Sequence, residues 1–452
     1  APAPNPIKAL LFQNKHYAPP ESFPVYHTMR EMLEHNASER PDDVAFQYLR
    51  GRKELVSHTY AEFYQTVVYL GTYMLKRGIR GRKIALVGEN SYEWLLCYFA
   101  IVTTGNVAVL VAKDATPAEA STLIFQSEAD VVVTSRKYPY EKELLAQKLV
   151  KNKYCFSMRE FDEWEEKGKQ FHEKGRNLYD KVTLDPEALS TIFFTSGTSG
   201  TSKGVMLSER NMCTSLCTYG ARAENWITSR LPEGQKLPLS HMTLLPLFHM
   251  ACFVCVMSYP PAGWALNLCS DIRDFYRDLG LMHSDIMASA PMLVETVYND
   301  FKRGRVSRLN GLWDLCCSSA ALDPKMLLEL AQNGFVINQC YGMTETFGDG
   351  ILNFTQVEKH MSAVGKPDDH KPDDYVEYKL DETGEICIKG DCVMLGYYKD
   401  PEATAEVIDA DGWFHTGDLA RVDEEGFYYI TGRKKNLIIL ASGENVSPEE
   451  LE

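Results

Sequence analysis

A loop of threonine, serine and glycine residues is the first feature of the chain that could do chemistry. It runs from Thr195 to Gly204 and lies between the apolar residues Phe194 and Val205. Glycines let the backbone approach an anion closely, and exposed N–H groups can form a nest around it. Hydroxyl groups and the compact charge of Lys203 would add donors. Because both flanks are apolar, the pattern favours a phosphate-binding loop over a flexible linker.

The loop is not a Walker A motif. Ser202 occupies the position of the second motif glycine, and Gly204 occupies the position of the motif serine or threonine. Further short motifs follow in the chain: Leu245 to His249, Tyr341 to Thr346, Gly384 to Ile386, Gly396 to Tyr398, Gly412 to Asp418 and Gly432 to Lys435. Together they resemble the acyl-adenylate-forming enzymes: acyl- and aryl-CoA synthetases, peptide-synthetase adenylation domains and firefly luciferase. The resemblance covers about residues 30 to 452 and is strongest to the fatty acyl-CoA synthetases.

The resemblance implies that the chain joins a carboxylic acid to ATP, giving an acyl-adenylate and pyrophosphate, and then makes a thioester with CoA. ATP or AMP, Mg²⁺ and CoA are the implied cofactors. Since two anions meet at the α-phosphate, positioning and charge neutralisation would dominate the chemistry. The loop would hold the β- and γ-phosphates through Thr195, Ser196, Gly197, Thr198, Ser199, Gly200, Thr201 and Lys203.

The later motifs receive roles by the same resemblance. Glu345, together with Thr195, would bind Mg²⁺, which prefers hard oxygen ligands, and Thr344 would hydrogen-bond the α-phosphate. Asp418 would accept both ribose hydroxyls, and Arg433 would support the ribose from the far side of the cleft. Tyr341 would stack on adenine, and the rest of the nucleotide pocket would be built from Ser319, Ala320, Gln339, Cys340 and Gly342.

His249 has two possible interpretations. In fatty acyl-CoA synthetases the matching histidine lies near the acyl carboxylate, whereas the simpler interpretation is a histidine that starts a helix. The spacing of His249, Cys252 and Cys255 also suits zinc superficially. The segment is otherwise almost wholly apolar and no fourth ligand is evident, so buried structural cysteines are the preferred interpretation.

The substrate is expected to be an uncharged acid chain. Peptide-synthetase domains for amino acids usually carry an aspartate early in the pocket helix, but no acidic residue stands between Met250 and Asp271. An uncharged pocket favours a medium- or long-chain fatty acid, or an aryl acid. Three alternatives stay open: loading of a carrier protein instead of CoA, a non-catalytic acyl-adenylate-binding member and, more remotely, a luciferase-like oxygenase.

Composition excludes several classes of protein. The 452 residues are 45% hydrophobic and 24% charged, as in ordinary globular chains, and the net charge of −15 disfavours nucleic-acid binding. Twelve scattered cysteines and the absence of a signal-peptide pattern predict a cytoplasmic protein. The uncharged stretch from Trp94 to Ala112 is interrupted by Thr103 to Asn106, so we expect a buried helix and strand rather than a transmembrane segment.

The elements that must position these residues alternate between helix and strand. Helical periodicity marks Tyr60 to Arg77, and short β runs occur at Lys83 to Val87, Val107 to Val111 and Asp130 to Val133. This rhythm predicts an α/β fold with parallel sheets flanked by helices. The polar stretch from Lys151 to Lys181 is expected to be a surface connection.

The domain organisation is predicted from a change of pattern near the C-terminus. Residues 1–432 would form a large N-terminal domain, with a β-rich subdomain of antiparallel hairpins from about residue 372. Residues 433–452 would form a hinge and the start of a small C-terminal α+β domain, cut off in a helix that Ser447 caps. The resemblance puts a catalytic lysine beyond Glu452, so we expect slow adenylation and little thioester formation from this chain.

Overall fold

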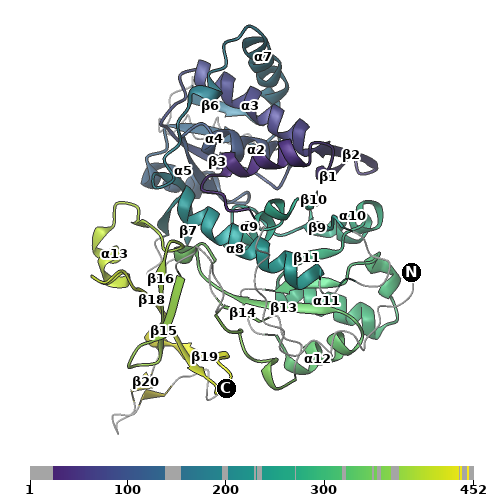
Figure 1. The fold of residues 1–452 in the computed structure, drawn as a ribbon, viewed down its shortest axis with the longest axis vertical. Helices are drawn as coiled ribbons and strands as arrows, with labels where there is room; N and C mark the ends of the chain where they lie inside the picture. Colours follow the sequence, from purple (N-terminus) through teal and green to yellow (C-terminus); the bar gives the residue numbers. More distant parts are fainter. Residues whose placement is uncertain are drawn as a thin grey trace.

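The computed structural model describes residues 24–137, 154–195, 202–228, 231, 237–269, 271–317, 322–348, 351–353, 358–367, 376–436, 438–439 and 445–446. Two large sheets with helices packed on them form most of the molecule, and a smaller antiparallel sheet lies beside them (Figure 1). The predicted α/β fold class is therefore confirmed.

The first large sheet has seven strands in the order β17-β8-β7-β4-β3-β5-β6. Its five consecutive strands from β7 to β6 pair in parallel, and β8 and β17 continue the sheet in antiparallel pairing. The strands are β3 (Lys83–Val87), β4 (Val107–Val111), β5 (Val131–Thr134), β6 (Cys155–Ser157), β7 (Leu189–Thr195), β8 (Lys203–Ser208) and β17 (Gly396–Tyr397). The central strands are buried on both faces, which explains their continuous Val, Ile and Leu runs.

Helices α3 (Tyr60–Lys76), α4 (Tyr92–Val102) and α5 (Pro117–Ser127) accompany this sheet. Phe63, Val67, Leu70 and Met74 of α3 are buried, as their spacing along one helical face predicts. Thr59 begins α3 with a capping box, in which its hydroxyl and the Glu62 carboxylate satisfy each other's backbone N–H groups. The uncharged stretch after Trp94 is a buried helix, α4, followed by the buried strand β4, as expected.

One expectation about this part of the chain is wrong. Residues 154–181 are not a surface connection but contribute β6 to the sheet and helix α7 (Phe161–Glu173) to its cover. Phe161, Trp164 and Gly168 form a narrow buried stripe on α7. A Cβ atom at Gly168 would lie 2.0 Å from the carbonyl oxygen of Tyr69, so α7 packs very closely on α3.

The second large sheet has eight strands in the order β14-β13-β12-β11-β9-β10-β1-β2. Its six central strands are parallel, and an antiparallel strand closes each end. The strands are β1 (Val44–Arg50), β2 (Glu54–Thr59), β9 (Ser240–Thr243), β10 (Ala265–Leu268), β11 (Ile286–Ser289), β12 (Asp314–Cys317), β13 (Val336–Tyr341) and β14 (Ile351–Asn353).

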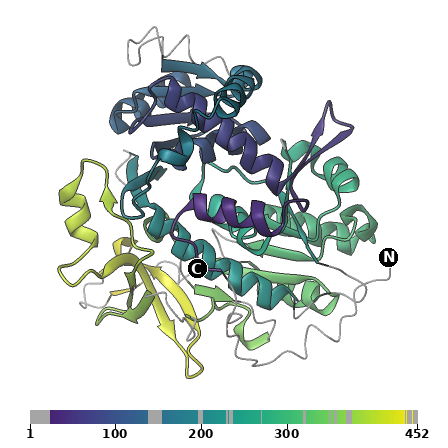
Figure 2. The ribbon, with the colours of Figure 1, turned by 45° about the horizontal axis from the view of Figure 1, so that its top comes forward.

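Several helices pack on or near this second sheet. They are α2 (Met29–Glu39), α8 (Glu209–Thr228), α9 (Met250–Met257), α10 (Phe275–Met282), α11 (Pro291–Lys302) and α12 (Pro324–Gln332). Helix α8 crosses the middle of the molecule between the two large sheets (Figures 1 and 2). One apolar cluster contains Leu86 of the first sheet, Phe253 of α9 and Leu266 of the second sheet, so both sheets share a core.

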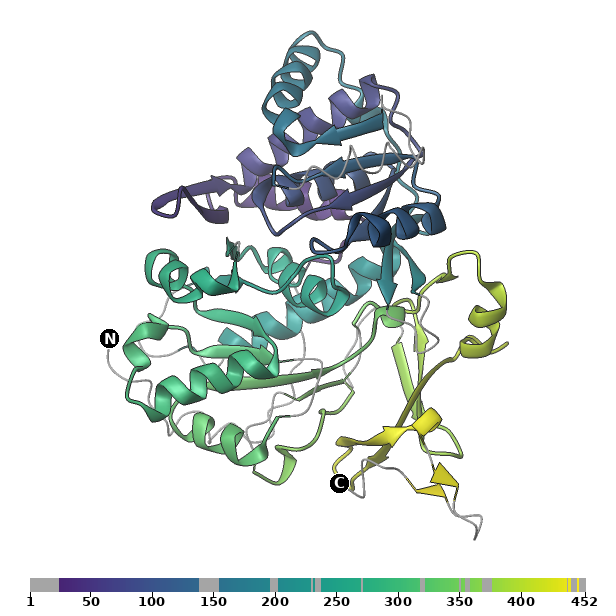
Figure 3. The same ribbon diagram turned by 180° about the vertical axis from the view of Figure 1, so that it is seen from behind.

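The small sheet is antiparallel, with the order β15-β16-β18-β19. It comprises β15 (Val376–Leu380), β16 (Glu385–Gly390), β18 (Phe414–Val422) and β19 (Tyr428–Arg433), with helix α13 (Pro401–Val407) alongside. Figure 3 shows it from behind, next to both large sheets. These strands match the predicted hairpins.

The last described strands are β20 (Ile438–Ile439) and β21 (Asn445–Val446). The predicted helix start at Ser447 lies outside the described residues. Within the described part of the chain, none of the helices is both long enough and apolar enough to cross a membrane.

Candidate active site

The site begins where strand β13 ends, at one edge of the second large sheet. Tyr341 is the last residue of β13, and a short 3₁₀ helix, η7 (Thr344–Thr346), follows it. A Cβ atom at Gly342 would lie 2.4 Å from the carbonyl oxygen of Gly348, so only glycine lets this turn close. The carboxyl ends of parallel strands are the usual place for ligands in open α/β sheets. Thr344 and Glu345 are thus held at that edge, both half-buried.

The small sheet contributes the next two side chains. Asp418 on β18 lies directly opposite Arg433 on β19. The Asp418 carboxylate accepts a hydrogen bond of 2.6 Å from Arg433 Nε on one oxygen and one of 2.9 Å from the Tyr341 hydroxyl on the other. Hydrogen bonding to Asp418 raises the pKa of Arg433, and burial with the nearby Asp418 charge raises the pKa of Tyr341. A phenol, a carboxylate and a guanidinium from two sheets are thereby fixed relative to one another.

The first large sheet supplies a cation. Lys203 begins β8 and pairs with Thr195 at the end of β7. Its ammonium nitrogen lies 4.6 Å from the ring centre of Tyr397 on β17. The Tyr397 hydroxyl donates a hydrogen bond of 2.7 Å to Glu345 Oε1. Tyr397 therefore lies between the lysine of the loop and the carboxylate of η7.

The sequence motifs included Tyr397 but assigned it no role. The signal was its position beside Gly396 in the Gly-Tyr-Tyr motif. The backbone around it is equally tied to the site: Met394 N donates to the carbonyl oxygen of Glu345 at 2.8 Å, and Leu395 N to that of Met206 at 2.9 Å. Burial and the neighbouring Glu345 carboxylate raise the pKa of Tyr397, so it remains a hydrogen-bond donor at neutral pH.

The donor set around Glu345 fits Mg²⁺. A carboxylate and a threonine hydroxyl are hard oxygen ligands of the kind this ion takes. Glu345 is half-buried, and Lys203 on the other side of Tyr397 supplies a second positive charge for a polyphosphate. Thr195, at the end of β7, is half-buried as well.

Two residues expected near adenine are engaged with other protein groups. The Gln339 amide donates a hydrogen bond of 2.8 Å to the carbonyl oxygen of Met361, and Cys340 Sγ lies 3.1 Å from Cys316 Sγ. The other expected nucleotide-binding residues lie outside the described residues: Ser196, Gly197, Thr198, Ser199, Gly200, Thr201, Ser319 and Ala320.

His249 is the N-cap residue of α9, and its carbonyl oxygen accepts hydrogen bonds from the backbone N–H groups of Cys252 and Phe253. Its side chain is exposed, although partial desolvation still lowers the pKa of the imidazole. His249 is in no metal-type cluster of the described residues. Cys252 is buried and Cys255 interacts with two other thiols instead, so the zinc-like spacing is not assembled into a site.

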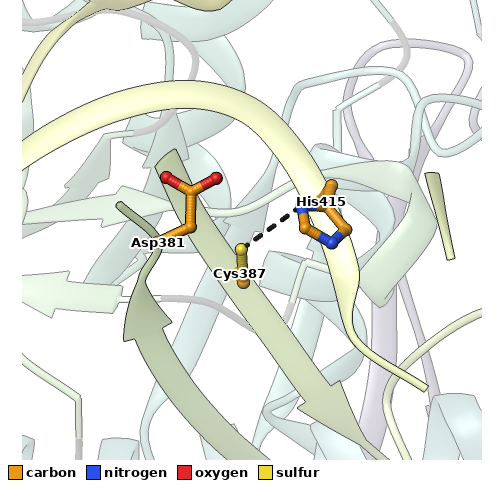
Figure 4. Close-up of side chains that lie close together, drawn as sticks. All are labelled: Asp381, Cys387 and His415. Carbon is orange, nitrogen blue, oxygen red and sulfur yellow. Dashed lines mark hydrogen bonds between the residues drawn. The ribbon is translucent and has the colours of Figure 1, made fainter. Parts of the chain in front are cut away.

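The described residues contain one other group with metal-type chemistry, formed by Asp381, Cys387 and His415 of the small sheet (Figure 4). His415 Nδ1 lies 3.5 Å from Cys387 Sγ. Asp381 accepts hydrogen bonds from Thr383 and Glu385 backbone N–H groups, and the Lys434 ammonium lies 3.6 Å from it. Because the Lys434 ammonium already lies beside the Asp381 carboxylate, we interpret the group as a network of contacts that stabilises the small sheet.

Comparison with known proteins shows the family of the chain. Residues 33–398 match the AMP-binding enzyme family. The chain belongs to the AMP-binding enzyme family. The matched region covers the loop after Thr195, the turn after Tyr341 and the Gly-Tyr-Tyr motif. Asp418 and Arg433 follow this region in the sequence.

Individual relatives cover most of the chain. Long-chain-fatty-acid–CoA ligase 5 of Rattus norvegicus is 29% identical over 463 residues, covering 87% of this chain and 66% of that protein. A long-chain-fatty-acid–CoA ligase of Escherichia coli is 27% identical over 475 residues, covering 94% of this chain and 80% of that protein. The chain thus spans just under two thirds of the length of the rat relative.

The fold is shared with solved structures of this kind. The o-succinylbenzoate–CoA synthetase of Bacillus subtilis, solved with its acyl-adenylate intermediate, has a TM-score of 0.75 at 22% identity and covers 93% of this chain and 81% of its own. At that identity the likeness describes the fold and leaves the substrate open.

Proposed function

We propose that this protein activates a carboxylic acid with ATP, giving an acyl-adenylate and pyrophosphate, and then transfers the acyl group to CoA. The observation that carries the proposal is the position of Asp418 on the small sheet, where it accepts hydrogen bonds from Arg433 and from Tyr341, the last residue of β13 before the turn to Glu345. One end of the site thus offers groups for a nucleoside and the other offers charges for phosphates.

The adenosine would bind on the side of the small sheet. Tyr341 offers an aromatic face for the base, and Asp418 can accept hydrogen bonds from ribose hydroxyls. An ionised carboxylate has about four acceptor positions, so its bonds to Tyr341 and Arg433 leave capacity for a sugar. Arg433 orients the carboxylate through its hydrogen bond.

The phosphates would bind between β8 and η7. The attacking carboxylate and the α-phosphate are both anionic, so bringing them together requires positive charge in the right place. Lys203 supplies part of it, and Thr344 offers a hydroxyl donor from η7. Mg²⁺ held by Glu345 and Thr195 would neutralise phosphate oxygens when bound. Tyr397 fixes the Glu345 carboxylate toward this side through its hydrogen bond.

We propose a medium- or long-chain fatty acid as the substrate. Helix α9 supports this choice of substrate, because its eight residues from Met250 to Met257 are all uncharged and almost all apolar. His249, exposed at the start of α9, would meet the carboxylate end of such an acid. The rat and E. coli relatives are named as long-chain-fatty-acid ligases. An aryl acid is the second candidate, because the B. subtilis enzyme of the same fold is named for o-succinylbenzoate.

CoA is the proposed thiol acceptor, with a carrier protein as the alternative. We propose the cytoplasm, because twelve scattered cysteines without the spacing of a disulfide scaffold favour a reducing compartment. The division into a large domain up to residue 432, including the small sheet, and a hinge segment from residue 433 stays a prediction.

A thermal-shift series with acyl-sulfamoyl adenosines tests the proposal. These stable mimics of acyl-adenylates would be supplied with increasing chain lengths and in one aryl version. A ligand that binds only the folded protein stabilises it by about 2.7 kcal/mol at a hundredfold excess over Kd. We expect a maximum at one medium or long chain, and loss of the shift in Asp418→Ala. Glu424→Gln, an exposed acid of the same hairpin, serves as the matched control and should keep the shift.

The outcomes separate the candidates. A maximum for the aryl version would replace the fatty acid by an aryl acid. Absence of any shift, also with ATP and Mg²⁺, would overturn the adenylate-forming proposal. Binding of the mimics without any pyrophosphate release from ATP and the same acid would favour a non-catalytic binding protein.

A further inference from the structure

Three cysteine thiols meet beside the nucleotide site. Cys316 lies near the end of β12, Cys340 near the end of β13, and Cys255 on α9. The sulfur atoms of Cys316 and Cys340 are 3.1 Å apart. Both of them lie near enough to Cys255 to lower its pKa. Distant segments of the chain therefore deliver three thiols to one place.

The exposure of the cysteines sets this group apart. Of the twelve cysteines, eight are buried and four are partly exposed: Cys155, Cys255, Cys316 and Cys340. Three of the four partly exposed cysteine residues are thus the ones that meet. Thiols packed in a core are protected from reagents, whereas partly exposed thiols can be reached by small oxidants.

The strand register explains why Cys316 and Cys340 lie diagonally to each other on the same face of the sheet. In the parallel pair β12 and β13, Cys316 is opposite Asn338. Side chains alternate between the two faces of a strand, so Asn338 and Cys340 point to the same face as Cys316. Cys317, the neighbour of Cys316, points to the other face and is buried.

We propose that Cys316 and Cys340 are a modification site that a hydroperoxide converts to a disulfide. One thiolate attacks the peroxide oxygen, giving a sulfenic acid and releasing water after proton transfer. The second thiol displaces the hydroxyl group as water, and the S–S bond forms. In sum, two thiols and one hydrogen peroxide give one disulfide and two waters. A disulfide S–S bond is about 2.05 Å long, so the sulfurs must approach by about 1 Å.

The chemistry of the third thiol favours this reaction. Interaction with Cys316 and Cys340 lowers the pKa of Cys255, whereas the pKa values of Cys316 and Cys340 are raised, so Cys255 is the thiol of the three that loses its proton most easily. Thiolates are the reactive form toward peroxide and exchange readily with neighbouring disulfides. Cys255 is therefore an accelerating neighbour, while the closest pair of sulfurs holds the final bond.

The disulfide would act on the nucleotide site through β13. Cys340 precedes Tyr341, whose hydroxyl bonds to Asp418. Drawing Cys340 toward β12 moves the backbone of Tyr341 and disturbs this contact. We expect adenosine ligands to bind about tenfold more weakly after oxidation, which corresponds to about 1.4 kcal/mol. This consequence rests on the proposed function, whereas the disulfide itself does not.

Peptide mapping by mass spectrometry tests the bond directly. The folded protein is treated with stoichiometric hydrogen peroxide, alkylated and digested without reduction. We expect a linked peptide pair containing Cys316 and Cys340, two fewer free thiols per chain, and full reversal by dithiothreitol. Cys316→Ser must abolish the linked pair. Cys255→Ser must keep it while slowing its formation, and Cys252→Ser, a buried thiol on the same helix, must leave both unchanged.

The result that overturns the proposal is equally defined. Linkage of Cys255 to either partner, or oxidation of all three thiols to sulfinic acid without a linked pair, contradicts the assigned site. If the linked pair forms but the reduced protein binds no adenosine ligand, the proposed function fails and the modification site stands. If the pair forms and adenosine binding is unchanged, the coupling through β13 is wrong.

Discussion

The Tyr397 hydroxyl and Glu345 Oε1 are joined by a hydrogen bond of 2.7 Å across 52 positions of the chain. The bond connects β17 of the seven-stranded sheet with η7, the 3₁₀ helix that follows β13 of the eight-stranded sheet. The Lys203 ammonium lies over the ring of Tyr397. The Tyr397 side chain therefore sets the separation between the Lys203 cation and the Glu345 carboxylate. Such a spacer can fix where a metal-bound polyphosphate lies.

Replacing Tyr397 by phenylalanine tests this relationship. The ring and its contact with Lys203 stay, but Glu345 loses a donor to its charge, a bond that contributes about 1.5–3 kcal/mol in typical cases. We expect affinity for Mg²⁺-ATP to fall about tenfold, measured by calorimetry. Tyr398→Phe removes a surface bond to Glu128 and should leave that affinity unchanged. Equal affinities for both variants would show that Glu345 needs no such support.

Asp418→Asn tests recognition of the ribose. The amide keeps the shape but loses the charge that Arg433 and Tyr341 surround, and it accepts hydrogen bonds on one oxygen only. We expect adenosine ligands to bind about ten- to a hundredfold more weakly. The preference for ATP over 2′-deoxy-ATP should also shrink toward parity. A retained preference for the ribose would move the sugar to other residues.

Gly342→Ala tests the tight turn between β13 and η7. The added methyl group would lie 2.4 Å from the Gly348 carbonyl oxygen, so the backbone must shift, at a cost of about 1–3 kcal/mol of unfolding free energy. Gly280→Ala in α10, where nothing lies within 4 Å, is the matched control. It should stabilise the protein by about 0.5–1 kcal/mol. Denaturant unfolding of both variants measures the difference.

His241 predicts a loss of stability in acid. It is fully buried, its Nε2 accepts a hydrogen bond of 2.8 Å from Ala288 N, and burial lowers its pKa to about 3. The pKa in the unfolded chain is about 6.5, so between these values the unfolded chain binds more protons. Stability should therefore fall as the pH drops from about 6.5, by up to about 1.4 kcal/mol per pH unit.

His241→Gln isolates this contribution, because glutamine keeps a hydrogen-bond acceptor but does not titrate. Unfolding free energies of both proteins would be measured between about pH 5 and pH 7.5. We expect the wild type to lose more stability than the variant as the pH falls through this range. Parallel curves would show that the histidine titrates alike in the folded and unfolded chain.

Much of the fold follows from local patterns. The helix predicted from Tyr60 to Arg77 spans Tyr60–Lys76 in the structure. The prediction is close because the apolar stripe of the helix and its Thr59 cap are both local features of the sequence. Helix α7 was missed, since its buried stripe is only Phe161, Trp164 and Gly168 within an otherwise polar segment. A glycine on a buried stripe marks close helix packing, but its partner Tyr69 is distant in sequence.

The candidate site also contains residues that local motifs predict and residues that only the structure brings to notice. Tyr341, Glu345 and Asp418 were predicted from specific motifs, and their roles stay predictions. The structure joins Asp418 of the small sheet to Tyr341 at the end of β13, and Glu345 follows in η7. Tyr397 was left without a role because its meaning depends on two partners from two other segments. The meeting of Cys316 with Cys340 depends likewise on strand register, which spacing along the chain does not encode.

Strand β17 also has a consequence for the free protein. Gly396 and Tyr397 pair with Met206 and Val205, so they cover part of the outer edge of β8. An uncovered edge of apolar strands is a template for pairing with other chains. Tyr397, which also donates a hydrogen bond to Glu345, therefore helps to shield β8 from pairing with other chains. Engineering this segment for new substrates would put solubility at risk before it changed any affinity.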